Sequence, residues 1–291
     1  MPTARQWFQG ARPLTLPAAI SPVAAGTGVA AFTDDANWVR AVLCLVVALA
    51  LQVGVNYAND YSDGIRGTDD ERQGPVRLTG SKLATPEHVR AAAFLAFLVG
   101  ALAGLALVVL TREWWLLLVG VAALLAAWYY TGGRSPYGYR GLGEISVFLF
   151  FGVVATAGTA YVQVGEFTSM AWTTSFGVGA LACALLVVNN LRDIPTDTAS
   201  GKRTLAVRLG DTNTRVLYIG LVTGALGVVV TLALGWTEWA LLALGAFIVA
   251  VPPIGAVAAR ATGRALIPVL VATGQVQLLY GLLLGLGFAL A

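Results

Sequence analysis

The sequence predicts an all-α, polytopic membrane protein in which nine transmembrane helices surround a central cavity. Composition is the first observation behind this class: 57% of the 291 residues are hydrophobic and only 11% are charged, with a mean hydropathy of +0.76. Soluble domains carry about 25% charged residues. The second observation is that runs of about 20 apolar residues, long enough to cross a bilayer, recur along nearly the whole chain. We therefore expect residues 1–291 to form a single membrane-embedded domain.

Hydropathy divides the chain into nine spans, and several of them carry recognisable start signals. Thr85 and Pro86 provide an N-cap and a first-turn proline for the third span, and residues 211–214 provide caps for the seventh. Pro252 and Pro253 are expected to kink the eighth. In chain order, the predicted spans are 14–33, 39–59, 88–110, 114–131, 143–164, 170–191, 214–234, 239–259 and 265–290.

Basic residues are distributed unequally between the two sides of these spans. Of the 18 Lys and Arg residues, all but Arg40 and Arg112 fall in the N-terminal segment or beside the loops that follow even-numbered spans. The positive-inside rule then predicts a multi-pass protein of the cell membrane with a cytoplasmic N-terminus and an outer C-terminus. This topology also explains the pI near 9.0 without a nucleic-acid partner. The first span could instead be a cleaved signal peptide, but the consistent alternation of later spans favours an uncleaved helix.

Small residues recur at the four-residue spacing that lets membrane helices pack closely. The chain has 34 glycines, and three pairs with this spacing are candidate contact points between helices. These pairs are Gly100/Gly104, Gly220/Gly224 and Gly281/Gly285.

Acidic and amide residues gather where the second and sixth spans are predicted to end. Asn56, Asp60 and Asp63 share one helical face, and the later stretch NNLRDIPTDTASGKRTLAVRLG repeats the pattern with Asn189, Asp193 and Asp197. Single acids near helix ends are often simple caps or solvated termini. Here, however, both sets lie at C-terminal ends, where the helix dipole repels negative charge. This repetition favours a function over capping.

Both clusters belong to long loops, at about 60–87 and 192–213, which the predicted topology places on the cytoplasmic side. Facing carboxylates form a site for Mg²⁺, which prefers oxygen ligands and often binds substrate phosphates as well. Nearby Lys and Arg side chains would neutralise the remaining charge of such an anion. The residues therefore predict a diphosphate substrate whose hydrophobic tail lies among the helices, with an active site toward the cytoplasm.

At these residues the sequence resembles the UbiA superfamily of membrane prenyltransferases, in the stretches Asn59-Asp60-Tyr61-Ser62-Asp63 and Asp193-Ile194-Pro195-Thr196-Asp197. The similarity covers essentially the whole chain. Longer segments, including ARPLTLPAAISPVAAG and YYTGGRSPYGYRGLGEISVFLFFG, are similar to the 1,4-dihydroxy-2-naphthoate polyprenyltransferase branch. This resemblance implies transfer of a polyprenyl chain from polyprenyl diphosphate to 1,4-dihydroxy-2-naphthoate, with loss of CO₂ and diphosphate, in menaquinone synthesis.

The resemblance also implies roles for individual residues. Mg²⁺ and the prenyl diphosphate would be held by four acids, Asp60, Asp63, Asp193 and Asp197, assisted by Asn56, Asn59 and Asn189. Arg140 matches a basic residue that meets the diphosphate, and Lys82 and Lys202 are further candidates for neutralising it. Asp69 follows the first motif as a third acid at wider spacing.

An allylic cation left by the departing diphosphate needs an electron-rich, dry surrounding, and aromatic rings supply one. Candidate rings near the predicted site are Tyr129, Tyr130, Tyr137, Tyr139, Phe148 and Phe151. An aromatic belt at the membrane interface is the alternative explanation for them. Glu144 would either orient the aromatic acceptor or pair with Arg140, and the pairing is the favoured interpretation.

Three other functions compete with this interpretation. A transporter would place ionisable residues near the bilayer midplane, whereas these acids lie at the ends of spans. A CDP-alcohol phosphotransferase shares the start Asp60-x-x-Asp63-Gly64, but Thr68 and Asp69 stand where its signature requires an Ala-Arg pair. Other branches of the same superfamily, which act on 4-hydroxybenzoate or haem, remain open as alternatives.

Overall fold

The computed structural model describes residues 2–67 and 77–291, and every regular element in these ranges is helical. Within these described ranges, seven helices are long and apolar enough to cross a membrane, and a bent pair of N-terminal helical segments gives an eighth candidate. The apolar helix α5 (Leu116–Tyr129) has 14 residues, so it extends only about 21 Å and does not cross a 30 Å hydrocarbon core unaided. The multi-pass architecture is confirmed, whereas nine complete crossings stay a prediction.

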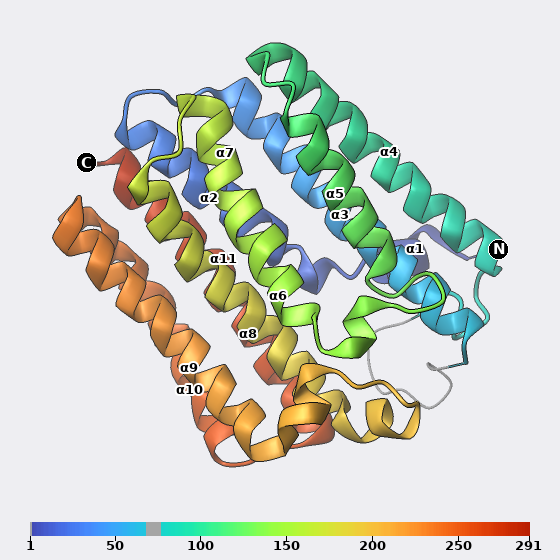
Figure 1. The fold of residues 1–291 in the computed structure, drawn as a ribbon. Coiled ribbons are helices and arrows are strands. Elements are labelled where there is room, and N and C mark those ends of the chain that lie inside the picture. The colour runs from blue at the N-terminus through green and yellow to red at the C-terminus, as the bar shows by residue number, and fades with distance from the viewer. Residues whose placement is uncertain (1, 68–76) are drawn as a thin grey trace.

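The N-terminal half contains the short helix α1, a bent first span and two long antiparallel helices (Figure 1). α1 was not expected from hydropathy, although a capping box formed by Thr3 and Gln6 marks its start. α3 and α4 pack against each other along their lengths, and α5 lies beside both. The bounds are α1 (Ala4–Gly10), the 3₁₀ turn η1 (Pro13–Thr15), α2 (Pro17–Phe32), α3 (Trp38–Ile65) and α4 (Pro86–Thr111).

In the C-terminal half, one span changes its helical type and two others are joined into a hairpin. The predicted span 143–164 is continuous but includes the π-helical segment η3. α8 and α9 pack as an antiparallel pair, and α11 packs on α2, so that the last span closes against the first. The bounds are η2 (Tyr137–Arg140), α6 (Gly143–Val147), η3 (Phe148–Val154), α7 (Ala155–Val164), α8 (Ser169–Ala199), α9 (Leu205–Gly235), η4 (Glu238–Leu244), α10 (Gly245–Ala258), η5 (Gly263–Ala265) and α11 (Leu266–Ala289).

Two helices continue further than their apolar sequences suggested. α3 extends to Ile65 rather than ending near residue 59, and α8 extends to Ala199 rather than ending near residue 191. Both acidic motifs are therefore parts of helices and not of the loops that follow. Hydropathy misses these turns because it detects only the part of a helix that lies in an apolar environment.

Glycines allow α2 and α11 to cross with their backbones in contact. A Cβ atom added to Gly281 would lie 2.3 Å from Ser21 Oγ, and one added to Gly28 would lie 2.4 Å from the Cα atom of Gly285. The expected contact at Gly281 and Gly285 is thus confirmed. The expectation for Gly220 and Gly224 is wrong, because nothing lies within 4 Å of a Cβ atom added to either.

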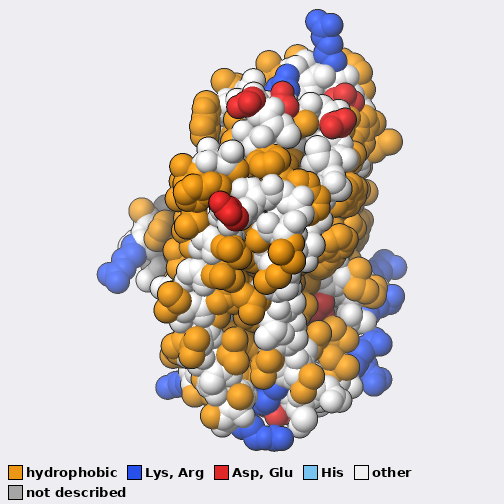
Figure 2. Space-filling model, turned by 90° about the vertical axis from the view of Figure 1, so that its left-hand side faces the viewer, with side chains coloured by type: hydrophobic (Ala, Val, Ile, Leu, Met, Phe, Trp, Pro, Cys, Tyr) orange, Lys and Arg blue, Asp and Glu red, His pale blue; other side chains and the backbone are white. Residues whose placement is uncertain are grey.

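The outer surface has the polarity expected for a membrane-embedded protein. Hydrophobic side chains cover the middle of the face seen in Figure 2, and most of the Lys and Arg side chains in that view gather at its lower end. Large apolar residues are accordingly exposed, including Leu118, Leu234 and Ile248 at 75%, 85% and 76%. In water such a surface would favour aggregation, whereas lipid tails cover it.

The contact between α2 and α11 yields a stability prediction with a matched control. Gly281→Ala places a methyl group against Ser21, so we expect it to lower the free energy of unfolding by about 1–3 kcal/mol. Gly220→Ala, in the interior of α9 with open space around it, is expected to be neutral or to stabilise by about 0.5–1 kcal/mol. Thermal unfolding of the two purified variants in one detergent measures both effects. Equal shifts would contradict the assigned contact.

Candidate functional site

One cavity of about 1360 Å³ lies between the helices and has chemically different ends. At the C-terminal ends of α3 and α8 it is charged; at the opposite ends of the helices Trp115 and Trp172 line it. Small and aliphatic residues of α4 and α5, together with Phe150 and Phe151 of η3, line much of the space between. The expected central cavity is therefore present, although α9 and α10 contribute nothing to its lining. Its charged end includes Asp63, Arg77, Arg192, Asp193, Asp197 and Lys202.

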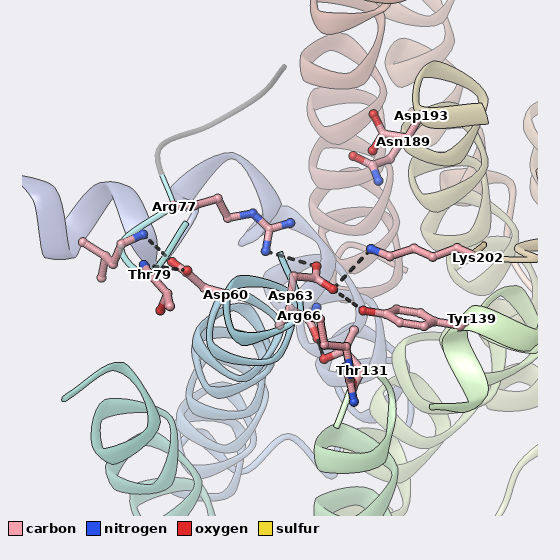
Figure 3. A network of polar contacts seen from close by, with 12 residues as sticks. Asp60, Asp63, Arg66, Arg77, Thr79, Thr131, Tyr139, Asn189, Asp193 and Lys202 are labelled. Carbon is pink, nitrogen blue, oxygen red and sulfur yellow. Dashed lines mark hydrogen bonds and ion pairs between the residues drawn. The ribbon is translucent and has the colours of Figure 1, made fainter. Parts of the chain in front are cut away.

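Asp63 is the centre of the polar network at this end (Figure 3). Its buried carboxylate is paired with Lys202 Nζ at 3.2 Å and with Arg77 Nη1 at 3.4 Å. Lys202 follows α8, whereas Arg77 comes from the segment before α4. Two cations from distant parts of the chain thus compensate one carboxylate, which would otherwise be costly to bury.

Tyr139 of η2 also faces Asp63 (Figure 3), and its hydroxyl donates a hydrogen bond to the carboxylate. Burial and the adjacent Asp63 charge raise the pKa of this hydroxyl, which therefore keeps its proton and remains a donor. Lys202 Nζ lies 4.6 Å from the centre of the Tyr139 ring, and the Arg66 guanidinium lies 5.6 Å from it. Tyr139 therefore contacts three charged groups, Asp63, Lys202 and Arg66. It also lines the cavity, as predicted.

The α8 acids line the same cavity as this network. Arg192 makes a two-pronged contact with Asp193, at 2.7 Å through Nε and 2.9 Å through Nη2, and Nη2 also donates to Asn189 Oδ1 at 2.9 Å. Asp197 lines the same cavity, and its backbone carbonyl accepts from the amide of Lys202 at 2.9 Å. The structure thus brings the α8 motif and Asp63 to one space.

Asp60 has a different position from Asp63 although both belong to the first motif. Its carboxylate accepts hydrogen bonds from the backbone amides of Leu78 at 2.6 Å and Thr79 at 2.9 Å, and it is absent from the cavity lining. Figure 3 shows Asp60 turned toward this backbone and away from Lys202. In this structure Asp60 fastens the segment before α4 to the end of α3.

The two asparagines of the first motif line the cavity while binding neighbouring elements. Asn56 Nδ2 donates to the carbonyl of Ala11 at 2.9 Å and to Thr15 Oγ1 at 3.0 Å. Asn59 Oδ1 accepts from Thr131 Oγ1 at 2.7 Å. Asn56 therefore holds the turn between α1 and α2, and Asn59 holds the end of α5.

Several other predicted residues are not brought to the cavity. Arg140 is exposed and donates to Ser135 Oγ, and Lys82 is exposed with a left-handed backbone conformation (φ 56°). Neither lines the cavity, so the expectation that they meet a diphosphate has no geometric support here. Tyr137 does line it, with its hydroxyl near the carbonyl of Ala126 and Ser146 Oγ, each at 2.8 Å. Asp69 lies outside the described residues.

Three arginines line the cavity although the sequence did not predict them as site residues; they contributed only to the excess of basic residues on one side of the membrane. Besides Arg77 and Arg192, Arg12 lines the cavity in a left-handed conformation (φ 53°, ψ 68°). Such a conformation costs of order 1–3 kcal/mol in a non-glycine residue and persists only when its surroundings enforce it. The hydrogen bonds from Asn56 to the adjacent Ala11 and to Thr15 supply that constraint. Of these three arginines, only Arg192 had a sequence feature that indicated a place in the site, because it directly precedes Asp193.

The donor set fits Mg²⁺ by its chemistry. Asp63, Asp193 and Asp197 offer carboxylate oxygens to a single cavity, and Asn59 and Asn189 add amide oxygens. Within the described ranges, no three His, Cys, Asp or Glu side chains converge closely enough to form a metal cluster. Oxygen ligands from two helices, supplemented by phosphate oxygens, are nevertheless the kind of environment that Mg²⁺ takes.

Comparison with known proteins finds relatives that all belong to one family of prenyltransferases. The profile of the UbiA prenyltransferase family matches residues 19–262. A protein of Mycobacterium tuberculosis (strain ATCC 25618 / H37Rv) named 1,4-dihydroxy-2-naphthoate octaprenyltransferase is 54% identical over 279 residues, covering 95% of this chain and 94% of the relative. The protein of the same name in Mycobacterium leprae (strain TN) is 50% identical, with the same coverage of both chains.

Solved structures share the fold. A UbiA homologue from Archaeoglobus fulgidus, determined with bound GPP and Mg²⁺, matches 98% of this chain and 100% of its own with a TM-score of 0.65. Sequence identity between the two is 15%, so this similarity establishes the fold alone.

The contacts of Asp60 predict a local effect on the backbone before α4. Asp60→Asn replaces one accepting oxygen by a donor, so one of the two amides, Leu78 or Thr79, should lose its buried partner. We expect hydrogen exchange at these amides to accelerate about tenfold or more in the metal-free protein. Asp193→Asn, on α8, is the matched control and should leave them unchanged. Unaltered exchange in Asp60→Asn would show that the two contacts do not hold this backbone.

Proposed function

Because this chain belongs to the UbiA prenyltransferase family, we propose that it transfers a polyprenyl chain from a polyprenyl diphosphate to 1,4-dihydroxy-2-naphthoate. The reaction releases diphosphate and CO₂ and gives demethylmenaquinol, an intermediate of menaquinone synthesis. Support for this acceptor comes from the two mycobacterial relatives, which are named for it and are at least 50% identical to almost the whole chain.

The observation that carries the proposal is a single cavity with a charged end and a long apolar remainder. A prenyl diphosphate has the same division, since a strongly charged head is joined to a hydrocarbon tail. Burial of that tail is favourable by about 0.8 kcal/mol for each CH₂ group removed from water. The cavity thus suits a substrate with a charged head and a hydrocarbon tail that must be kept out of water.

Mg²⁺ would be held by Asp63, Asp193 and Asp197 together with substrate oxygens, and Asn189 would assist. When bound, the ion supplies Lewis-acid stabilisation to a diphosphate leaving group. The Archaeoglobus fulgidus structure contains both GPP and Mg²⁺, which supports a metal requirement within this fold. We assign Asp60 a positioning role instead, because its oxygens are used by the backbone of Leu78 and Thr79.

Three cations of the cavity would neutralise the departing anion. Lys202, Arg77 and Arg192 each contact a carboxylate that we assign to the metal. When these carboxylates bind a divalent ion, the same cations can turn to diphosphate oxygens without leaving the cavity. Fixed charges of this kind stabilise developing negative charge with little reorganisation.

Aromatic residues would protect the allylic cation that remains after cleavage. Tyr130, Tyr137, Tyr139 and Phe151 line the cavity, as the sequence predicted for this group. Tyr129 and Phe148 do not line it, so the same role is not assigned to them. Rings next to a cation contribute about 0.5–2 kcal/mol each.

The chain is a multi-pass membrane protein, and we infer that its charged cavity end faces the cytoplasm. This orientation follows from the predicted excess of Lys and Arg at that end. A transporter is disfavoured because the described acids of the cavity lie at helix ends and not at mid-depth. Acceptors used by other branches of the superfamily, 4-hydroxybenzoate and haem, are alternatives that an acceptor panel distinguishes.

The proposal predicts Mg²⁺-dependent formation of a prenylated, decarboxylated product. Purified protein is incubated with farnesyl diphosphate, Mg²⁺ and either 1,4-dihydroxy-2-naphthoate or 4-hydroxybenzoate, and products are identified by mass spectrometry. We expect product only with the naphthoate, and none in EDTA. Asp193→Asn should reduce turnover at least about 100-fold, because it weakens metal binding.

Asp211→Asn is the matched control for this assay. Asp211 of α9 pairs with Arg215 of the same helix and with Arg260 after α10, and it does not line the cavity, so turnover should be retained. Product with 4-hydroxybenzoate but not with the naphthoate would reassign the acceptor. Full turnover in EDTA would refute the metal assignment.

A further inference from the structure

A buried pair of polar side chains, Glu144 and Asn190, adjoins the cavity and has no part in the network around Asp63. Glu144 is the second residue of α6 and is 7% exposed, and its Oε1 atom accepts a hydrogen bond from Asn190 Nδ2 at 3.0 Å. The expected pairing of Glu144 with Arg140 is wrong, since Arg140 donates to Ser135 instead. Glu144 Oε2 is buried without a hydrogen-bond partner in the part of the chain that the structure describes. A carboxyl group kept in such surroundings costs free energy, which makes it a candidate for function.

The two residues of this pair have different access to the cavity. Asn190 lines it, next to Asn189 and one turn before Asp193, whereas Glu144 does not. Any effect of Glu144 on a molecule bound in this cavity must therefore pass through Asn190.

Glu144 determines which end of the Asn190 amide is available. An asparagine amide has a donating and an accepting end, and its orientation is normally set by its partners. Because Glu144 Oε1 accepts from Nδ2, one N–H of the amide is held by Glu144 and the orientation of the amide is fixed. Asn190 Oδ1 receives no hydrogen bond from any residue that the structure describes. The pair thus offers a hydrogen-bond acceptor of fixed orientation, Asn190 Oδ1, to a molecule in the cavity.

An accepting oxygen matches one of the two proposed substrates. A diphosphate carries only acceptor oxygens, so it gains nothing from Asn190 Oδ1. A dihydroxylated aromatic ring carries hydroxyl donors. Aromatic rings that could contact such a substrate also line the cavity. The rings of Tyr130 and Tyr137 have their centres 5.5 Å apart in an edge-to-face arrangement. Gly143 leaves space for the Tyr130 hydroxyl, which would lie 3.0 Å from a Cβ atom added there, so this ring reaches the start of α6 beside Glu144.

We propose that Asn190, oriented by Glu144, accepts a hydrogen bond from a ring hydroxyl of the aromatic acceptor. This inference rests on the proposed prenyltransferase function and adds the residues that recognise the second substrate. Asn190 is then a substrate-binding residue, and Glu144 is a positioning residue that acts through it.

The test is a separate KM for each substrate in a set of variants. Glu144→Ala and Asn190→Ala should each raise the KM for 1,4-dihydroxy-2-naphthoate about tenfold, the value of one hydrogen bond. The KM for farnesyl diphosphate and the Mg²⁺ dependence should stay within about twofold. Glu144→Gln keeps an accepting oxygen of the same reach, so it should rescue the acceptor KM to within about threefold of the parent.

Cys183→Ala is the matched packing control. Cys183 Sγ donates to the backbone carbonyl of Glu144 at 3.1 Å, so this substitution disturbs the same contact between α6 and α8 without touching Asn190. It should leave both KM values unchanged. If Glu144→Ala cannot be purified in folded form, Asn190→Ala carries the same prediction by itself.

The outcomes separate this inference from the function on which it rests. An active parent together with an unchanged acceptor KM in Asn190→Ala would overturn the inference and leave the function standing. Equal increases in both KM values, or an altered Mg²⁺ requirement, would assign Asn190 to the diphosphate end and overturn it as well. If Glu144→Gln raised the KM for 1,4-dihydroxy-2-naphthoate as much as Glu144→Ala does, the positioning role of Glu144 would be overturned. A parent that prenylates no aromatic acceptor would refute both proposals.

Discussion

Neutralisation of the buried Asp63 carboxylate is the interaction on which the charged end of this protein depends. Lys202, Arg77 and the Tyr139 hydroxyl all meet at this one side chain, yet they come from three separate segments of the chain. Removing one partner of a buried charge pair typically costs about 3–5 kcal/mol, because the other charge is left uncompensated. The demand for compensation therefore draws α3, η2 and the connection after α8 together, and it forms the charged end of the cavity as a consequence.

The extension of α3 and α8 beyond their apolar sequences places the acids at this meeting point. Since both motifs are helical, Asp63, Asp193 and Asp197 project from fixed positions into the cavity and not into solvent. The same two helices line the apolar part of the cavity toward the opposite side. A single pair of helices thus joins a site for a charged group to a compartment for a hydrocarbon chain, which is the combination that a prenyl diphosphate requires.

Hydropathy and motif spacing predicted the helical membrane fold, the cavity and most of its acidic lining. They did not predict which acid of the first motif faces the cavity, because Asp60 and Asp63 share one helical face. The choice between them depends on Leu78 and Thr79, whose amides reach only Asp60. Spacing also could not show that Arg140 is exposed while Arg77 is buried beside Asp63.

The short helix α1 and the strained turn at Arg12 were missed for a related reason. Hydropathy detects long apolar segments, whereas α1 has seven residues and the turn is enforced by contacts with Asn56 on α3. The Glu144–Asn190 contact could likewise not be predicted from the sequence, since 46 positions separate its partners. Local signals thus predicted the helices and their faces, while long-range hydrogen bonds decided which polar residues meet.

The central claim is that the carboxylates of α3 and α8 form a metal-dependent binding end for a diphosphate. It is tested most directly by isothermal titration of the purified protein with farnesyl thiodiphosphate, an unreactive analogue, in the absence of any aromatic acceptor. We predict binding in the presence of Mg²⁺ that is lost when EDTA is added. The same affinity with and without Mg²⁺, or no binding under either condition, would contradict the claim.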